Sequence, residues 1–141
     1  MNTLQHSSDI VGMATELPAW ACRELMGSTL VGRVAFVDVD GPVVLPVNFV
    51  LDGDTVLFCT SSVNAIGRHL DSATVEFEVH EFDGPTKSGW SVVVRGVASF
   101  VSARELSRDE GLRPFSWADG VRTFVVRVTP VSVTGRRILP G

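Results

Sequence analysis

Valine is the commonest residue of this chain, and it is concentrated in short apolar runs that end at turn sequences. β-branched residues favour the pleated, half-buried surface of a strand. The run Thr29–Val39 is followed by Asp40-Gly41, and Val43–Leu51 is followed by Asp52-Gly53-Asp54. Asp-Gly between such runs is a strong hairpin signal. The sequence therefore predicts six strands, over Thr29–Val39, Val43–Leu51, Thr55–Thr60, Thr74–Glu81, Trp90–Val101 and Thr123–Val133.

Short helices are predicted around these strands. Pro18–Met26 has proline in its first turn and Gly27 directly after it, which are typical start and stop residues. A second helix is expected over Asn64–Leu70, and a third after Ser102, where Glu105 completes a capping box. Long crossover helices have no room, so the order favours an antiparallel sheet over a parallel α/β fold. The expected class is mainly β, a six-stranded antiparallel split β-barrel of Greek-key type with two or three short helices.

The length and charge of the chain limit the function classes. Its 141 residues are the size of one domain, which we expect over residues 17–141 after a flexible N-terminal extension, residues 1–16. The net charge of −4 gives no general attraction for nucleic acid. No apolar run reaches the roughly 18 residues of a membrane helix. Two isolated cysteines and no secretory signal at the start predict a cytoplasmic protein.

Familiar catalytic motifs are missing from the sequence. It contains no GxGxxG or GxSxG motif, and its three histidines lack the spacing of metal ligands, so no metal site is expected. Cys59 is interpreted as a small buried hydrophobic residue. Glu76 and Glu78 alternate with apolar residues and are interpreted as the solvated face of a strand. Catalytic residues are therefore not assigned.

Three segments are candidates for binding a ligand. Leu45–Phe49 places a proline and an asparagine inside an apolar strand, which predicts an edge or a bulge with free backbone groups. Thr60–Asn64 brings hydroxyl groups to a helix start, a plausible anion site with Arg68 one turn further on. Gly89–Gly96 carries Trp90 and Arg95, and a tryptophan near an arginine can wall a planar ligand. Trp117 and the pair Arg136-Arg137 are possible substitutes in that role.

Together, in this order, the segments resemble the pyridoxamine 5′-phosphate oxidase-like superfamily of flavin-binding split barrels. The resemblance implies a homodimer. It implies that a small-molecule ligand, flavin mononucleotide (FMN), binds at the subunit interface. No nucleic-acid or membrane partner is expected. The matching stretches are Gly32–Phe36, Val44–Phe49, Val56–Thr60, Val75–Val79, Gly89–Gly96 and Val133–Arg137. The cofactor-binding residues that it implies, together with the segments above, are Pro46, Val47, Asn48, Cys59, Thr60, Ser61, Ser62, Asn64, Arg68, Trp90 and Ser91.

The sequence departs from this family at the phosphate site. Relatives that bind FMN usually carry an arginine and a lysine where this chain has Cys59 and Ala65. Two lost charged hydrogen bonds, each worth roughly 1.5–3 kcal/mol, weaken the expected site. Arg68, on the same helix face as Ala65, could compensate in part.

Three functional hypotheses follow from the resemblance and its departures. The first is an FMN-dependent oxidoreductase with a weakened phosphate site. The second is a split barrel that binds the deazaflavin F420, or another ligand such as haem, in the same groove. The third is a binding dimer that has lost its cofactor and does no catalysis.

Overall fold

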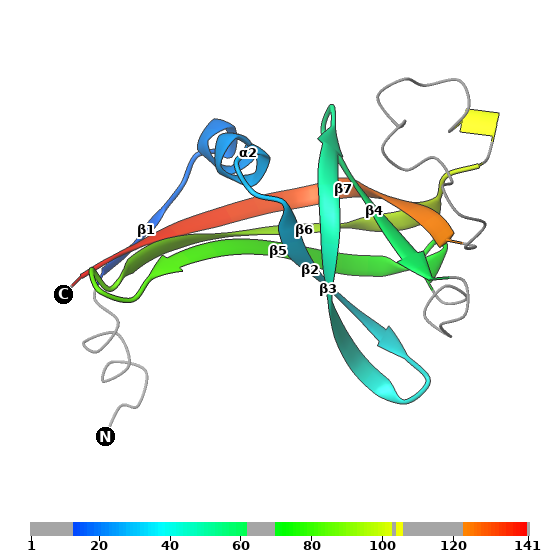
Figure 1. Ribbon diagram of the computed structural model, residues 1–141, viewed down its shortest axis with the longest axis horizontal. Coiled ribbons are helices and arrows are strands. Elements are labelled where there is room, and N and C mark those ends of the chain that lie inside the picture. The colour runs from blue at the N-terminus through cyan, green and yellow to red at the C-terminus, as the bar shows by residue number, and fades with distance from the viewer. Residues whose placement is uncertain (1–12, 62–69, 103, 106–122, 141) are drawn as a thin grey trace.

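The computed structural model describes residues 13–61, 70–102, 104–105 and 123–140, and one antiparallel sheet dominates it (Figure 1). The seven strands lie in the order β1-β7-β4-β3-β2-β5-β6, and β6 also pairs with β7. This last pairing closes the hydrogen bonding of β2 to β7 into a ring, while β1 flanks β7. The strands are β1 (Met13–Glu16), β2 (Val31–Asp38), β3 (Gly41–Asp52), β4 (Thr55–Ser61), β5 (Thr74–Asp83), β6 (Ser88–Phe100) and β7 (Thr123–Leu139), and helix α2 spans Ala19–Gly27.

Two tight turns set the register of β2, β3 and β4. Asp38 pairs with Gly41, so the first turn consists of Val39 and Asp40, one residue earlier than the Asp-Gly pair suggests. Gly41 has φ +118°, a conformation that favours glycine. Asp52 pairs with Thr55 across the second turn, in which Gly53 has φ +58°. The β2–β3 hairpin projects from the rest of the sheet (Figure 1).

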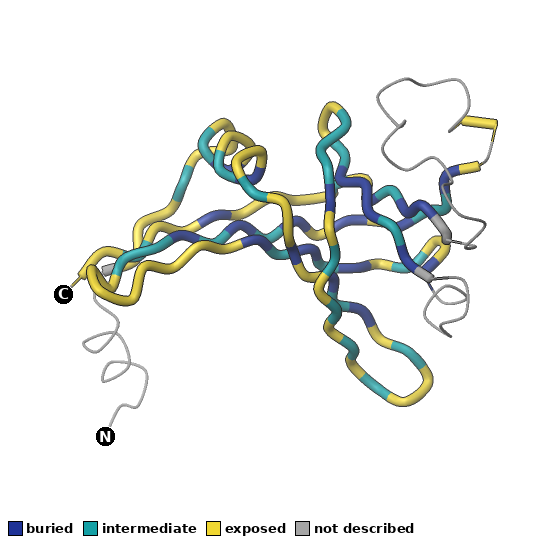
Figure 2. Tube along the Cα trace, viewed as in Figure 1, coloured by how far each residue is buried: buried dark blue, intermediate teal, exposed yellow. Residues whose placement is uncertain are grey.

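The core lies inside the ring and follows strand alternation. On β6, Trp90, Val92 and Val94 are buried, whereas the residues between them are only partly covered. The rings of Phe49 and Phe77 meet edge to face with their centroids 4.8 Å apart. Figure 2 shows buried residues along the middle of the long strands, with exposed residues at the hairpins and at one end of the sheet. At this end Glu81, Phe82 and Lys87 are exposed.

The mainly β, antiparallel class is confirmed, but the strands differ from the prediction in two ways. Met13–Glu16, assigned to the flexible extension, forms β1 and pairs with Arg136–Leu139 of β7. β7 itself continues to Leu139, past the predicted end at Val133. Its last part contains Gly135, Arg136 and Arg137 and lacks apolar alternation, so pairing with β6 and β1 keeps it extended. Neither of these two pairings is visible in a local sequence pattern.

The helices agree with the sequence where they are described. α2 occupies Ala19–Gly27, one residue later than predicted at both ends. The amide of Glu105 donates to Ser102 Oγ over 3.1 Å, which is the first half of the predicted capping box. Apart from Leu70, the helix predicted over Asn64–Leu70 lies outside the described residues. No helix in the described part of the chain is long and apolar enough to span a membrane.

Candidate functional site

The first candidate site begins where β3 and β4 stop pairing with each other. Their pairing runs from Asp52 and Thr55 only to Phe49 and Phe58. Beyond that point β3 continues alongside β2 to Gly41, while β4 continues alongside β7 to Ser61. The predicted proline-containing segment Pro46-Val47-Asn48 lies just past the divergence. β3 is therefore an interior strand of the sheet, yet no strand in the described part of the chain pairs with this segment on its β4 side, which gives the open edge that the proline predicts.

The side chains at this divergence point to two different sides. Pro46 and Asn48 are exposed on the outer face of β3, whereas Val47 packs against the core. On β4, Thr60 is buried, and Cys59 is half-buried beside Leu57 and Val125 of a small outer cluster. Pro46, Asn48 and Cys59 are thus placed to border a ligand.

Cys59 carries no charge to this site. Burial raises the pKa of its thiol above the ordinary value, so the neutral form dominates near neutral pH. A neutral thiol neither attracts nor repels an anion strongly. Position 59, where the family resemblance implies an arginine, therefore carries no charge in this chain. Ser61 ends β4, and the other predicted phosphate residues, Ser62, Asn64 and Arg68, lie outside the described residues.

A cation that the sequence analysis missed lies beside Pro46. Arg33 of β2 is the direct pairing partner of both Pro46 on β3 and Glu78 on β5, and its side chain is exposed on the outer face. Both oxygens of the Glu78 carboxylate lie 2.9 Å from His80 Nδ1. Among the described residues Arg33 has no ion-pair partner, so its guanidinium is available to an anion. The alternation of Gly32–Phe36 and the hairpin register together could have predicted this position.

The second candidate site surrounds Trp90 and lies at the far end of the sheet. Trp90 is 7 % exposed and pairs with Glu81 on β5 and Arg137 on β7. These residues line a pocket of about 460 Å³, within the range of small-molecule sites. Ser91 points to the opposite face, and so does Arg95, which binds Glu76. The suggested pairing of Trp90 with Arg95 does not form, and Arg137 takes that place.

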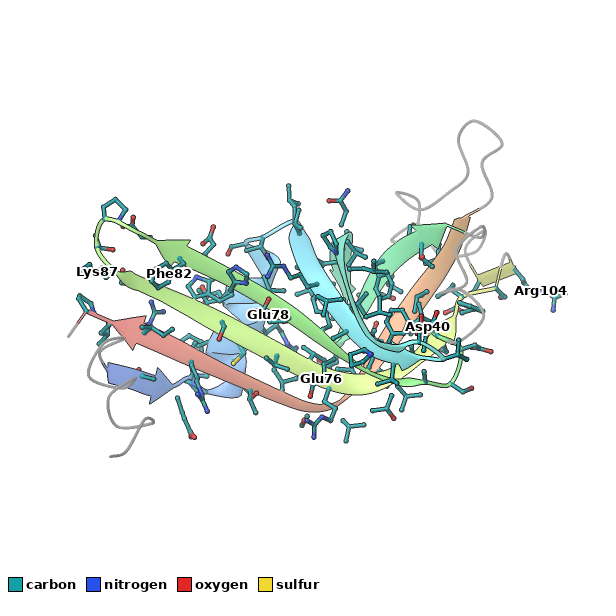
Figure 3. The ribbon with its side chains drawn as sticks, turned by 90° about the horizontal axis from the view of Figure 1, so that it is seen from below. Asp40, Glu76, Glu78, Phe82, Lys87 and Arg104 are labelled. Carbon is teal, nitrogen blue, oxygen red and sulfur yellow. The ribbon has the colours of Figure 1, made fainter. Side chains whose placement is uncertain are left out.

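Two of the predicted site residues, Thr60 and Ser91, are far apart within one chain. Thr60 pairs with Phe124 and Ser91 pairs with Arg136, and these two partners are twelve residues apart on β7. At about 3.3 Å per residue, that separation is roughly 40 Å along the strand. At this separation Thr60 and Ser91 of one chain cannot contact the same flavin ring. Figure 3 shows Phe82 and Lys87 at one end of the sheet and Arg104 at the other.

Metal chemistry receives no support from the described residues. They contain no cluster of three or more histidine, cysteine, aspartate or glutamate side chains that could hold a metal ion. The groups available at the two sites are backbone amides and carbonyls, an amide side chain, arginines and a tryptophan. This set suits a planar, hydrogen-bonding and anionic ligand.

Comparison with known proteins places the chain in a family. The family model described as pyridoxamine 5′-phosphate oxidase matches residues 18–137. The chain belongs to this family. The resemblance carried by the short sequence stretches is therefore confirmed. The match includes the divergence of β3 and β4 as well as the β5–β6 end of the sheet.

Relatives from actinobacteria share the sequence and the fold of this pyridoxamine 5′-phosphate oxidase family member. Uncharacterized protein Rv0080 of Mycobacterium tuberculosis is 34 % identical over 130 residues, covering 88 % of this chain and 85 % of the relative. The FAD binding protein of Mycobacterium smegmatis is 34 % identical with a TM-score of 0.69, covering 89 % and 98 % of the two chains. A conserved protein of unknown function, DIP1874 of Corynebacterium diphtheriae, is 31 % identical with a TM-score of 0.73, covering 89 % and 98 %.

Proposed function

We propose that this protein binds a flavin and acts as a flavin-dependent oxidoreductase. The observation that carries the proposal is the open backbone edge at Pro46-Val47-Asn48, where β3 has left β4. The pyrimidine side of a flavin ring has alternating donors and acceptors that match free backbone groups of a strand edge. Pro46 and Asn48, exposed beside this edge, would support and orient the ring.

The bound ring would supply hydride or electron transfer, while the protein supplies position and electrostatics. Val47 and the buried Thr60 fix the two backbones from the core side, so the edge is preorganised. Arg33 offers positive charge on the outer face next to Pro46. A cation there would favour the anionic form of a reduced ring or a phosphate group. FMN and flavin adenine dinucleotide (FAD) share both of these features.

We infer that the complete flavin site needs two copies of the chain. Ser91 lies roughly 40 Å along β7 from Thr60 of its own chain, so a flavin that contacts both residues must lie between two chains. In a twofold dimer in which the extended end of one sheet covers the β3–β4 edge of the other, two equivalent flavin sites would form, because a closed symmetric contact is reciprocal. We therefore propose a homodimer in which each flavin contacts Asn48 of one chain and the Trp90 end of its partner.

The relatives support a flavin without fixing which one. The M. smegmatis protein, similar over most of both chains, is an FAD binding protein. The uncharged Cys59 predicts that the phosphate contributes less to affinity than in relatives with an arginine at that position.

Titration of the purified protein with riboflavin, FMN and FAD, followed by quenching of flavin fluorescence, tests the proposal. Saturable binding of at least one flavin in the micromolar range, lost in Asn48→Trp, is expected because tryptophan at 48 blocks the strand edge. Thr129→Trp is the matched control, since Thr129 is also an exposed strand residue but lies on β7. Lack of binding of all three flavins would contradict the proposal and favour a cofactor-free dimer or the binding of another ligand.

A further inference from the structure

A groove beside the β2–β3 hairpin is not used by the proposed flavin ring. It has a volume of about 470 Å³. The hairpin forms one side of it, and the start of β5 with the middle of β6 forms the other. Its floor and walls are mostly apolar, with Ala35, Val37 and Val44 from the hairpin. Val44 is 61 % exposed and Val37 is 73 % exposed. Apolar side chains this open on a hairpin mark a binding surface.

The groove is continuous with the proposed flavin site. Asn48, Pro46 and Val44 alternate along the outer face of β3, and Val44 belongs to the groove. The span from Asn48 to Val44 is four residues, about 13 Å along the strand. Pairing places Val31 opposite Asn48, Arg33 opposite Pro46 and Ala35 opposite Val44. Arg33 therefore lies between the proposed ring position and the groove.

Polar groups in the groove suit a purine base. Arg95 donates from Nε and Nη2 to Glu76 Oε1, over 3.0 and 2.6 Å, so the guanidinium is held in one orientation. The second carboxylate oxygen of Glu76 has no partner among the described residues and can accept from an exocyclic amine. An arginine held in this way presents a flat cationic face on which an adenine ring can stack. Figure 3 shows Glu76 and Glu78 together on β5.

We propose that this groove binds the adenosine part of FAD, with Arg33 contacting the diphosphate, so that the protein prefers FAD to FMN. The inference rests on the proposed function, because it needs the flavin ring at Pro46 and Asn48. FAD is long enough to place its ring at Asn48 and its adenine beside Val44. Arg33, which has no ion-pair partner among the described residues, then neutralises the negative charge of the diphosphate, which the uncharged Cys59 does not do.

Affinities of FMN, FAD and 5′-AMP for the wild type and two hairpin variants test the proposal. FAD is expected to bind about tenfold more tightly than FMN, and 5′-AMP to compete with FAD. Val44→Glu places a carboxylate in the groove and should remove the preference for FAD while leaving FMN binding within about twofold. Val39→Glu is the matched control, because Val39 is on the same hairpin, is 83 % exposed and does not line the groove. Val37→Glu gives a second groove variant should Val44→Glu fail to fold.

Arg33→Gln separates the diphosphate contact from the groove. It should weaken FMN and FAD about tenfold while leaving riboflavin, which has no phosphate, unchanged. Equal affinity of FMN and FAD, or equal loss of both in Val44→Glu, would overturn the adenosine groove while leaving flavin binding intact. An unchanged FMN and FAD affinity in Arg33→Gln would overturn the diphosphate contact. Failure of every flavin to bind would instead contradict the proposed function itself.

Discussion

The Arg127 guanidinium donates to Asp52 Oδ2 over 2.9 Å and so connects β7 to the β3–β4 turn. Arg127 also donates to Thr55 Oγ1 over 2.7 Å and to Glu105 Oε1 over 3.0 Å. Its side chain is 18 % exposed, so solvent screens these bonds less than those of a surface pair. The contacts with Asp52 and Thr55 hold the paired ends of β3 and β4 at this turn, three residues before the two strands diverge toward the proposed flavin site.

Replacement of Arg127 by alanine is expected to lower the free energy of unfolding by about 1–3 kcal/mol, because a half-buried Asp52 loses its charged partner. Arg23→Ala is the matched control. Arg23 of α2 pairs with Asp54, which lies in the same β3–β4 turn as Asp52, but the Arg23 side chain is 62 % exposed. That change should cost below about 1 kcal/mol. Urea unfolding followed by tryptophan fluorescence measures both. Equal losses in the two variants would show that the burial of Arg127 adds nothing.

Gly135 provides a second test of packing, beneath α2. A Cβ at position 135 would lie 2.5 Å from Cys22 Sγ, closer than unbonded atoms approach. Gly135→Ala should therefore destabilise the protein by about 1–3 kcal/mol through overpacking. In Gly84→Ala, the control, the new methyl meets nothing within 4 Å. Thermal unfolding should also show that Cys22→Ala, which removes the sulfur, makes the added cost of Gly135→Ala smaller.

Local pattern was enough to predict the strands of this sheet. Val, Phe and Trp alternate with polar residues, and glycine turns separate β2, β3 and β4, so six of the seven strands are visible in the sequence. Pro46 also predicted an open edge, and the end of β3–β4 pairing at Phe49 provides it. These features depend on residues close together in the chain, which is why they could be predicted.

Features that depend on distant pairing could not be predicted from pattern. β1 is extended because it pairs with β7, and the last part of β7 is extended because it pairs with both β1 and β6. Trp90 was expected to share a ligand with Arg95, but the odd spacing of the two residues on one strand puts them on opposite faces. Arg137 replaces Arg95 only because β7 continues past Val133. The pairing of Thr60 with Phe124 and of Ser91 with Arg136 also places these two predicted site residues far apart along β7.

The half-buried position of Cys59 predicts an unusual pH dependence of its reactivity. Alkylation requires the thiolate, and burial raises the thiol pKa of Cys59 above the ordinary value of about 8.5. In a Cys22→Ala background, the iodoacetamide rate of the folded protein should therefore rise at a higher pH than in urea. The same shift stabilises the folded state below the unfolded pKa, and this contribution is lost as pH rises. Coinciding pH profiles for the folded and unfolded protein would contradict the predicted shift.

Restoring the cation that relatives carry at position 59 should strengthen phosphate binding. Cys59→Arg adds a guanidinium at the end of β4, and a charged hydrogen bond worth roughly 1.5–3 kcal/mol corresponds to about tenfold or more in affinity. The gain should appear for FMN and be absent for riboflavin. Cys59→Met, a long uncharged side chain at the same half-buried position, is the control. A similar gain for riboflavin, or the same gain in Cys59→Met, would mean that packing rather than charge is responsible.

The separation of the two candidate sites predicts how flavin binding is shared within a dimer. Asn48→Trp blocks the β3–β4 edge, and Trp90→Leu alters the extended end, so neither homodimer should bind flavin well. A heterodimer of the two variants has one flavin site with both changes and one with neither. If the sites are shared between subunits, heterodimers purified with two different tags should bind one flavin per dimer with wild-type affinity.

A site built within a single chain gives the opposite result, because each half of the heterodimer would then carry one damaging change and no intact site would form. Light scattering of the wild type should show a dimer, and circular dichroism should show that both variants are folded. A Trp90→Leu homodimer that binds flavin normally would remove the extended end from the site. The roughly 40 Å along β7 between Thr60 and Ser91 means that a flavin in contact with both residues must lie between two chains.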